Sequence, residues 1–233
     1  MTFIINKGVA GADPIRATDL TFGYAGSPVF DHFTTTIAAG ALTVLVGSNG
    51  SGKSTLLGLL AGVLHPHRGT VRVPARDIAL AVQRSQVTDT FPITAAEAVM
   101  MGRWRRLGLL RRPGRGDRAV VDHWLDELGL DGVRHRTLGE LSGGQRQRVL
   151  LAQTFAQEAA VLLLDEPTTG LDARTGDLVI SHLRRLAAGG ATVVAATHDH
   201  AVMWAADHRI DLDETPSAIH SRHVDGRSQR RPG

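Results

Sequence analysis

The sequence predicts an α/β fold in which a parallel sheet follows an N-terminal antiparallel β portion and is interrupted by a helical lobe. Three observations indicate this. The runs LTVLV (42–46) and VLLLD (161–165) are continuously apolar, which is typical of parallel strands covered on both faces. Residues 15–22 alternate apolar and polar side chains, as a half-buried antiparallel strand does. From about residue 91 to residue 157 the pattern is helical instead.

The first half of the chain supplies the early strands and one helix. Residues 15–46 are expected to form strands, and the apolar stretch 55–63 a helix. Short strands are expected in TVRV (70–73) and IALAV (78–82). The lobe then holds helices in three stretches: AAEAVMMGRW (95–104), DRAVVDHWLDELGL (117–130) and RQRVLLAQTFAQ (146–157).

The second half returns to strand, helix and strand. An amphipathic helix at 172–188 follows VLLLD, and the glycine pair at 189–190 ends it before the strand TVVAAT (192–197). Such units imply right-handed crossovers and a parallel sheet. We expect one domain from 1 to 233. In it, residues 1–90 and 158–215 form the β portion and core, 91–157 the lobe, and 216–233 a flexible tail with irregular last strands before it.

Composition excludes several classes of protein. The chain has 233 residues, 42% of them hydrophobic, a net charge of +3 and no cysteine, so a disulfide scaffold is excluded. Its longest apolar run, LLGLLAGVL (56–64), is far below the roughly 18 residues that span a bilayer. The first residues lack the apolar stretch of a signal peptide. We therefore expect a cytoplasmic protein that meets a membrane only through a partner.

The stretch GSNGSGKS (47–54) fits the phosphate-binding pattern G-x-x-x-x-G-K-[ST] between a buried strand and a helix. Its glycines let backbone N–H groups turn towards a phosphate, and the helix that follows directs its positive end at the same anion. Only two of the 26 basic residues are lysines, Lys7 and Lys53, so we expect Lys53 to be kept for its chemistry on the β- and γ-phosphates. The hydroxyl of Ser54 is expected on Mg²⁺.

Two acids follow a buried strand and complete this chemistry. Asp165 ends VLLLD at the carboxyl edge of the sheet, where it can orient Mg²⁺, and Glu166 comes next as a candidate base. By itself, such a pair is more often a helix cap or a solvated turn. His198 and Gln83 follow two other strands, and Tyr24 lies in an expected loop upstream. For these three residues the spacing alone leaves an ordinary polar or aromatic role open.

The stretch LSGGQ (141–145) places a hydroxyl and two glycines before a helix, as an anion site would require. Together with the phosphate loop, VLLLDEP (161–167), GLD (170–172) and THD (197–199), it makes the chain resemble the nucleotide-binding subunits of ABC transporters over about residues 15–210. The resemblance implies a P-loop NTPase with a RecA-like core that binds ATP and Mg²⁺ and hydrolyses ATP.

The resemblance also implies roles for individual residues. Glu166 would be the catalytic base, assisted by His198, Gln83 and Lys53. Ser54, Gln83 and Asp165 would hold Mg²⁺, and Tyr24 would stack on adenine. The nine remaining ATP contacts would come from one loop: Gly47, Ser48, Asn49, Gly50, Ser51, Gly52, Lys53, Ser54 and Thr55.

In this family two copies sandwich two ATP molecules head to tail. A second copy would therefore contribute its signature and D-loop residues to each site: Ser142, Gly143, Gly144, Gln145 and Asp172. The other implied partner is a separate integral-membrane permease, with a solute-binding protein acting indirectly if the system imports. The chain would then sit on the cytoplasmic face of the membrane, with no nucleic acid involved.

A finer resemblance concerns cargo. The elements QRS (83–85), FP (91–92) and MGR (101–103) with an arginine-rich continuation resemble ATPases of zinc and manganese importers, although importers of iron chelates and vitamin B12 share much of the pattern. The lobe is expected to hold a groove for a permease helix. The expected groove contacts are Phe91, Ala98, Val99, Met100 and Met101.

Other functions fit less well. A DNA-repair ABC ATPase needs a long coiled coil before the signature, a translation-type ATPase needs two cassettes, and a small-molecule kinase has no use for LSGGQ. A module that only binds nucleotide is expected to lose Glu166. The seven arginines of residues 102–118 form either a solvated loop or a surface near a membrane partner or anionic headgroups. The C-terminal histidines have no convincing metal-ligand spacing.

Overall fold

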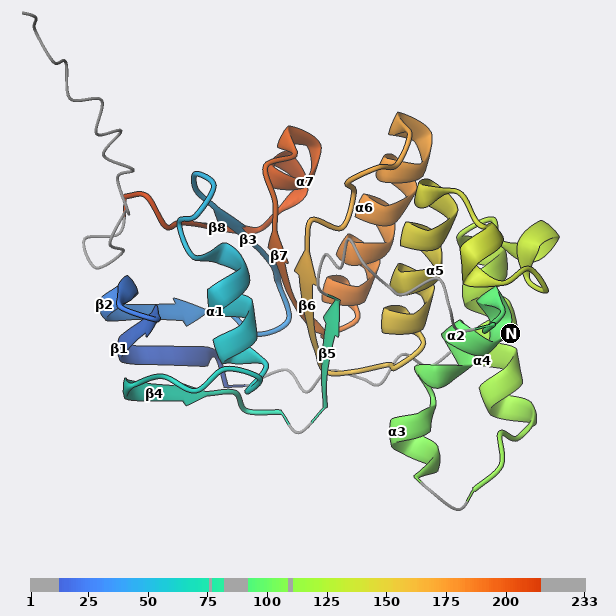
Figure 1. Cartoon of the computed structure of the whole chain (residues 1–233), viewed down its shortest axis with the longest axis horizontal. Coiled ribbons are helices and arrows are strands. Elements are labelled where there is room, and N and C mark those ends of the chain that lie inside the picture. The colour runs from blue at the N-terminus through green and yellow to red at the C-terminus, as the bar shows by residue number, and fades with distance from the viewer. Residues whose placement is uncertain (1–12, 76, 82–91, 109–110, 215–233) are drawn as a thin grey trace, which may run out of the picture.

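The computed structural model describes residues 13–75, 77–81, 92–108 and 111–214. Figure 1 shows three parts in a row: an antiparallel sheet at one end, a parallel sheet in the middle and a group of helices at the other end. This is the α/β arrangement with an N-terminal β portion and an inserted helical lobe that the sequence predicts.

The antiparallel sheet has the order β2-β1-β4, with β1 at Ile15–Tyr24, β2 at Ser27–Ile37 and β4 at Arg68–Arg72. The alternating side chains of β1 bury Ile15, Ala17, Leu20 and Phe22. Tyr24 is the last residue of β1 and not part of a loop, so its position differs from the expected one. The alternation shifts phase between Ala17 and Leu20, where the pairing with β2 is irregular, and the strand continues beyond this point to Tyr24.

The central sheet has the order β5-β6-β7-β3-β8 and all its neighbouring strands are parallel. Because parallel strands share one carboxyl edge, the residues that follow β3, β6 and β7 gather there. The last strand, β8, pairs regularly with β3, so the expected irregularity is absent at this point. The five strands have these bounds: β3 Leu42–Val46, β5 Ile78–Ala81, β6 Val161–Asp165, β7 Thr192–Ala196 and β8 His208–Asp211.

The two faces of the central sheet bury two hydrophobic clusters. Leu45 and Leu163 point to the face covered by α1 (Lys53–Leu60) and the antiparallel sheet. Their neighbours Val44 and Leu164 point to the opposite face, where α6 (Ala173–Ala188) and the lobe pack. Continuous apolar strands are therefore needed, since both faces are covered. As expected, α6 ends at a glycine cap, Gly189. The short helix α7 (His200–Ala205) precedes β8.

The lobe comprises α2 (Ala95–Met101), α3 (Trp104–Leu107), α4 (Arg115–Glu127) and α5 (Gly143–Phe155), with 3₁₀ turns η1 (Asp131–Val133) and η2 (Leu138–Glu140) before α5. Thr94 and Glu97 form a reciprocal capping box that starts α2. The signature glycines fall inside the first turn of α5, where we had expected them to precede the helix.

The expected permease contacts on α2 are partly wrong. Ala98 is 3% exposed and Val99 fully buried, and both belong to the cluster that joins the lobe to the sheet. A helix repeats its inward face every three to four residues, so a run of four apolar residues must turn some of them into the lobe core. Only Met100 and Met101 keep partial exposure, and Phe91 lies outside the described residues.

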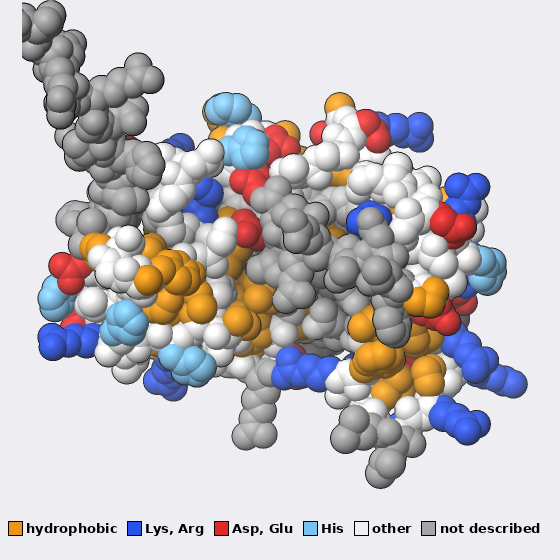
Figure 2. All heavy atoms as spheres, in the orientation of Figure 1, with side chains coloured by type: hydrophobic (Ala, Val, Ile, Leu, Met, Phe, Trp, Pro, Cys, Tyr) orange, Lys and Arg blue, Asp and Glu red, His pale blue; other side chains and the backbone are white. Residues whose placement is uncertain are grey.

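Positive side chains gather over α3 and α4, at the lower right of Figure 2. Three of the seven arginines make ion pairs: Arg103 with Asp117 and Glu158, Arg105 with Asp77, and Arg106 with Glu158. The other four are exposed: Arg111, Arg112, Arg115 and Arg118.

Among the described helices, none has the length and apolar character needed to cross a bilayer.

Candidate functional site

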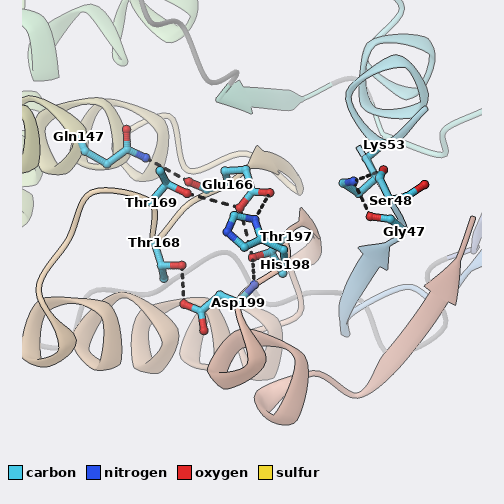
Figure 3. Close-up of polar contacts among 10 residues, drawn as sticks. All are labelled: Gly47, Ser48, Lys53, Gln147, Glu166, Thr168, Thr169, Thr197, His198 and Asp199. Atoms are coloured by element: carbon cyan, nitrogen blue, oxygen red, sulfur yellow. Dashed lines mark hydrogen bonds and ion pairs between the residues drawn. The ribbon is translucent and has the colours of Figure 1, made fainter. Parts of the chain in front are cut away.

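The loop that fits the phosphate-binding pattern, residues 47–54, connects β3 to α1. Gly52 caps α1 with φ 99°, and a Cβ there would lie 2.8 Å from side-chain atoms of both Phe30 and Val29, so only glycine fits. Lys53 folds back over the loop, where its Nζ donates to the carbonyl oxygens of Gly47 at 2.8 Å and Ser48 at 2.9 Å (Figure 3). The ammonium group of Lys53 is thus held by backbone carbonyl groups of the loop itself.

Asp165 ends β6 beside the start of α1. It is half-buried, and burial raises the pKa of its carboxyl group; the negative charge of Glu166 acts in the same direction. A hydrogen bond with Ser54 and the charge of Lys53 oppose that rise in pKa. The carboxylate of one motif and the hydroxyl and ammonium of another therefore meet in one place.

Glu166 occupies a left-handed backbone conformation, with φ 51°, and its N–H donates to the carbonyl of Ala196 at 2.8 Å. Such a conformation costs a non-glycine residue about 1 kcal/mol or more, and it turns the side chain away from the line of β6. The carboxylate is only 12% exposed. Its Oε1 lies 2.8 Å from Nδ1 of His198.

Further polar groups surround the same carboxylate (Figure 3). The hydroxyls of Thr169 and Thr197 lie 3.4 Å and 3.5 Å from Oε2 of Glu166. Gln147, from α5, directs its Nε2 at the carbonyl oxygens of Glu166 at 3.5 Å and Pro167 at 3.4 Å. The lobe and the core thus meet at the candidate base.

Tyr24 lies at the edge of the loop. Its hydroxyl is 3.3 Å from the Oγ1 of Thr55, and its ring packs edge-on against Phe22 with the ring centroids 5.1 Å apart. Half of the residue remains exposed.

The signature hydroxyl has a structural task within the chain. Ser142 Oγ accepts the N–H of Gln145 at 3.3 Å, while Gln145 Oε1 accepts the N–H of Ser142 at 3.0 Å, which is a capping box on α5. A Cβ on Gly144 would lie 3.0 Å from the carbonyl oxygen of Gly170, so the helix start packs tightly on the loop after Glu166. A Cβ on Gly143 would meet nothing within 4 Å, so this position offers open backbone.

Asp172 caps α6. Its carboxylate accepts the Thr175 N–H at 3.0 Å and the Thr175 hydroxyl at 2.9 Å, and the backbone hydrogen bond lowers the pKa of Asp172. Capping a helix is the ordinary role of an acid at this position. Asp172 is nevertheless exposed, so it can cap α6 and also face a second molecule.

The structure therefore brings Lys53, Ser54, Asp165, Glu166 and His198 to one edge of the sheet, with Tyr24 beside them. In Figure 1 the start of α5, with the signature, lies across β6 and β7 from α1. Gln83 lies outside the described residues. Within those residues no cluster of three or more His, Asp or Glu side chains could hold a metal ion.

Sequence reasoning missed several polar partners. Gln147 stands two residues after the signature and contacts the backbone of Pro167. Thr168 donates to Asp199 at 2.7 Å, which ties the loop after Glu166 to the start of α7. Asp213 accepts hydrogen bonds from Ser48. Thr168 and Thr169, which closely follow the two acids in sequence, could have indicated further polar contacts at this site. No pattern in the sequence indicated the contact of Asp213 with Ser48.

A loop ammonium, a hydroxyl–carboxylate pair and a carboxylate–imidazole pair at the carboxyl edge of a parallel sheet suit phosphoanhydride hydrolysis. Residues 30–169, well over half of the chain, match the family model described as ABC transporter. The chain belongs to the ABC transporter family. It is an ABC ATPase, an ATP-binding subunit of the kind that hydrolyses ATP.

Relatives of this ABC ATPase agree. The chain is 39% identical to the manganese transport system ATP-binding protein MntB of Listeria monocytogenes, over 77% of this chain and 78% of that protein. It is 36% identical to the zinc transport system ATP-binding protein TroB of Treponema pallidum, over 82% and 74%. Among solved structures, an inward-facing conformation of a metal-chelate type ABC transporter matches with a TM-score of 0.75 and 33% identity, covering 86% of this chain and 79% of that one.

Proposed function

We propose that this ABC ATPase binds ATP and Mg²⁺ at the loop after β3 and powers import of manganese or zinc through a separate membrane permease. The observation that carries the proposal is the 39% identity to a manganese-system ATP-binding protein over most of both chains. The loop ammonium and the Glu166–His198 pair support the catalytic part.

The nucleotide would be held by residues of one edge of the molecule. The N–H groups of the loop, Gly47 to Thr55, surround the phosphates, and Lys53 exchanges its backbone partners for phosphate oxygens. Tyr24, half of which is exposed, would stack on adenine. The contacts within the loop leave Lys53 already directed across it, so little rearrangement is needed.

The donor set fits Mg²⁺, which prefers hard oxygen ligands. The Ser54 hydroxyl and the Asp165 carboxylate are hydrogen-bonded neighbours at the carboxyl edge of the sheet. Gln83 is proposed as a third contact. When bound there, Mg²⁺ would neutralise charge on the phosphate oxygens.

Glu166 is proposed as the general base. Its carboxylate would take the proton of a water whose oxygen bonds to the γ-phosphorus while the bond to the ADP oxygen breaks. His198 holds one carboxylate oxygen, and Thr169 and Thr197 lie near the other, so the side chain is oriented before substrate arrives.

A second copy would complete each site. Gly143 presents open backbone at the start of α5, beside the exposed Ser142, whose hydroxyl also caps that helix. We propose that Ser142, Gly143, Gly144 and Gln145 of one copy face the γ-phosphate held by the other, with Asp172 at the same interface. The helix start would supply its positive end to that anion.

The permease is proposed to contact the lobe near Met100 and Met101, since Ala98 and Val99 are buried. Transport of an iron chelate or another small solute is the alternative, which the metal-chelate type transporter among the structural matches keeps in view.

The test of the cargo is a strain lacking the gene for this chain, grown in medium depleted of divalent metals by a chelator. Poor growth that manganese or zinc restores, and that iron chelates leave uncorrected, supports the proposal. Rescue by an iron chelate alone favours the alternative. Growth and metal content equal to the parent strain, with other importers also deleted, contradict both. Complementation with Lys53→Ala should fail where the wild-type gene succeeds.

A further inference from the structure

Asp213 joins the end of the described chain to the phosphate-binding loop. It follows β8, whose partner β3 leads directly into the loop, and Leu212 before it donates its N–H to the carbonyl of Val46 at 2.9 Å. Leu212 is fully buried, so this position is anchored. The carboxylate of Asp213 accepts the Ser48 N–H at 2.7 Å and the Ser48 hydroxyl at 3.0 Å.

Ser48 is a junction of the loop. While Asp213 binds its N–H and its hydroxyl, its carbonyl oxygen accepts Lys53 Nζ at 2.9 Å and the N–H of Ser51 at 3.1 Å. Asp213 therefore holds the N–H and the hydroxyl of Ser48 from outside the loop, and the carbonyl oxygen of Ser48 holds the ammonium group of Lys53 within it.

We propose that Asp213 is a positioning residue of the nucleotide site. It fixes Ser48, and through the Ser48 carbonyl it sets the place of Lys53 and the curvature of the loop that receives the phosphates. Hydrogen bonds to a carboxylate are stronger than those between neutral groups, so a single exposed aspartate suffices. This inference rests on the proposed nucleotide site, and it assigns Asp213 no contact with the nucleotide itself.

Asp207 provides a matched control at the other end of the same pair of strands. Its carboxylate accepts the N–H of Leu42, at the start of β3, at 2.8 Å. Both aspartates are exposed, and the carboxylate of each accepts one backbone N–H: Asp207 from Leu42 at the start of β3, and Asp213 from Ser48 in the loop that follows β3. They differ in one respect that matters here: Asp207 lies at the edge of the sheet opposite the loop.

The experiment compares the purified variants Asp213→Ala, Asp213→Asn and Asp207→Ala with the wild type. It measures the dissociation constants of ATP and ADP by calorimetry, KM and kcat for ATP hydrolysis, and the melting temperature. Since a hydrogen bond contributes modestly, we expect Asp213→Ala to raise both dissociation constants and KM about three- to tenfold while kcat stays within about twofold. Asp213→Asn, which keeps one acceptor oxygen, should fall between. Asp207→Ala should lower the melting temperature comparably and leave both dissociation constants unchanged.

A double-mutant cycle with Ser48→Ala tests the route. That variant lacks one of the two hydrogen bonds to Asp213, so Asp213→Ala should weaken ATP binding less in its background. Additive effects would contradict action through Ser48.

Several results would overturn the proposal. Unchanged nucleotide affinity in Asp213→Ala is one, and an equal loss in Asp207→Ala is another. Tighter ATP binding would show that the carboxylate only repels phosphate. If Asp213→Ala fails to fold, the same comparison of nucleotide dissociation constants is made between Asp213→Asn and Asp207→Asn. Lys53→Ala distinguishes failure of the proposed nucleotide site from failure of the role of Asp213. If Lys53→Ala binds ATP normally, the assignment of the loop as the nucleotide site is wrong. If only Lys53→Ala loses affinity, Asp213 alone is refuted.

Discussion

The imidazole of His198 and the carboxylate of Glu166 form a hydrogen-bonded pair across the carboxyl edge of β6 and β7, with His198 Nδ1 2.8 Å from Glu166 Oε1. The histidine side chain is 78% exposed and the glutamate side chain 12% exposed. The carboxylate is thus sheltered and oriented, while most of the imidazole faces solvent.

The first prediction concerns this pair. Glu166→Gln keeps the shape of the side chain but cannot accept a proton, so ATP hydrolysis should fall by about two to four orders of magnitude. ATP affinity should remain near wild type, and gel filtration with ATP and Mg²⁺ should show a trapped homodimer. His198→Ala serves as a comparison and should lose less of the turnover. Wild-type turnover in Glu166→Gln would refute the assignment of the base.

Ser142 tests the shared site. Ser142→Arg places bulk and positive charge where the partner's γ-phosphate is proposed to bind, so hydrolysis should be abolished while monomeric nucleotide binding persists. Because arginine also removes the cap of α5, a loss of about 1 kcal/mol in stability is expected. Ser142→Asp keeps a capping oxygen but repels phosphate, so it should be as inactive and more stable. Normal hydrolysis in either variant would exclude the head-to-tail arrangement.

Lys53→Arg keeps the charge and follows the chain's own preference for arginine. The planar guanidinium cannot take the place of a compact ammonium that contacts the carbonyls of Gly47 and Ser48 together. We expect ATP binding or turnover to fall strongly. Lys7→Arg, far from the motif in sequence, is the control and should behave as wild type. Unchanged kinetics in Lys53→Arg would mean that the lysine is incidental.

His182 predicts a pH dependence of stability. It belongs to α6 and is buried against Trp124 of α4 and Phe155 of α5. Burial, and next the charge of Arg185, lowers its pKa, while Glu127 opposes this. Below the unfolded value of about 6.5, the unfolded chain takes a proton that the folded chain refuses, so the free energy of unfolding falls as pH falls. His182→Phe should therefore lose less stability than wild type between about pH 7.5 and pH 5.5 in urea titrations.

A control of opposite sign is available for that experiment. A hydrogen bond with Asp19 raises the pKa of His32, so protonated His32 stabilises the fold below the unfolded pKa, and this stabilisation is lost as pH rises through the folded pKa. His32→Gln should therefore be destabilised mainly at the acidic end. If His182→Phe shows the same pH slope as the wild type, the buried neutral histidine is refuted.

Local pattern was enough to predict the parts of this molecule that depend on neighbours in sequence. Glycines at fixed spacing indicated the loop between β3 and α1, and Asp165 is placed by the strand that it ends. The parallel sheet followed from strands apolar on both faces. Each of these features is determined by residues that lie close together in the sequence.

What the sequence did not predict depends on contacts between distant segments. Asp213 and Ser48 are 165 positions apart, and only the pairing of β8 with β3 brings them together. Gln147 reaches the backbone of Glu166 because the start of α5 packs on the loop that follows β6. The burial of Ala98 and Val99 was missed because a run of four apolar residues gives no phase for the buried face of a helix.

The most direct test of the account measures the initial rate of uptake of radioactive manganese and zinc by cells lacking this gene. The cells carry wild-type, Glu166→Gln or Asp207→Ala copies, at matched levels of the chain. The account predicts that wild-type and Asp207→Ala copies restore uptake of at least one of these metals, whereas the Glu166→Gln copy leaves it at the level of the deletion strain. Equal uptake with and without a functional copy, or full uptake with Glu166→Gln, would contradict an ATPase that powers the import of these ions.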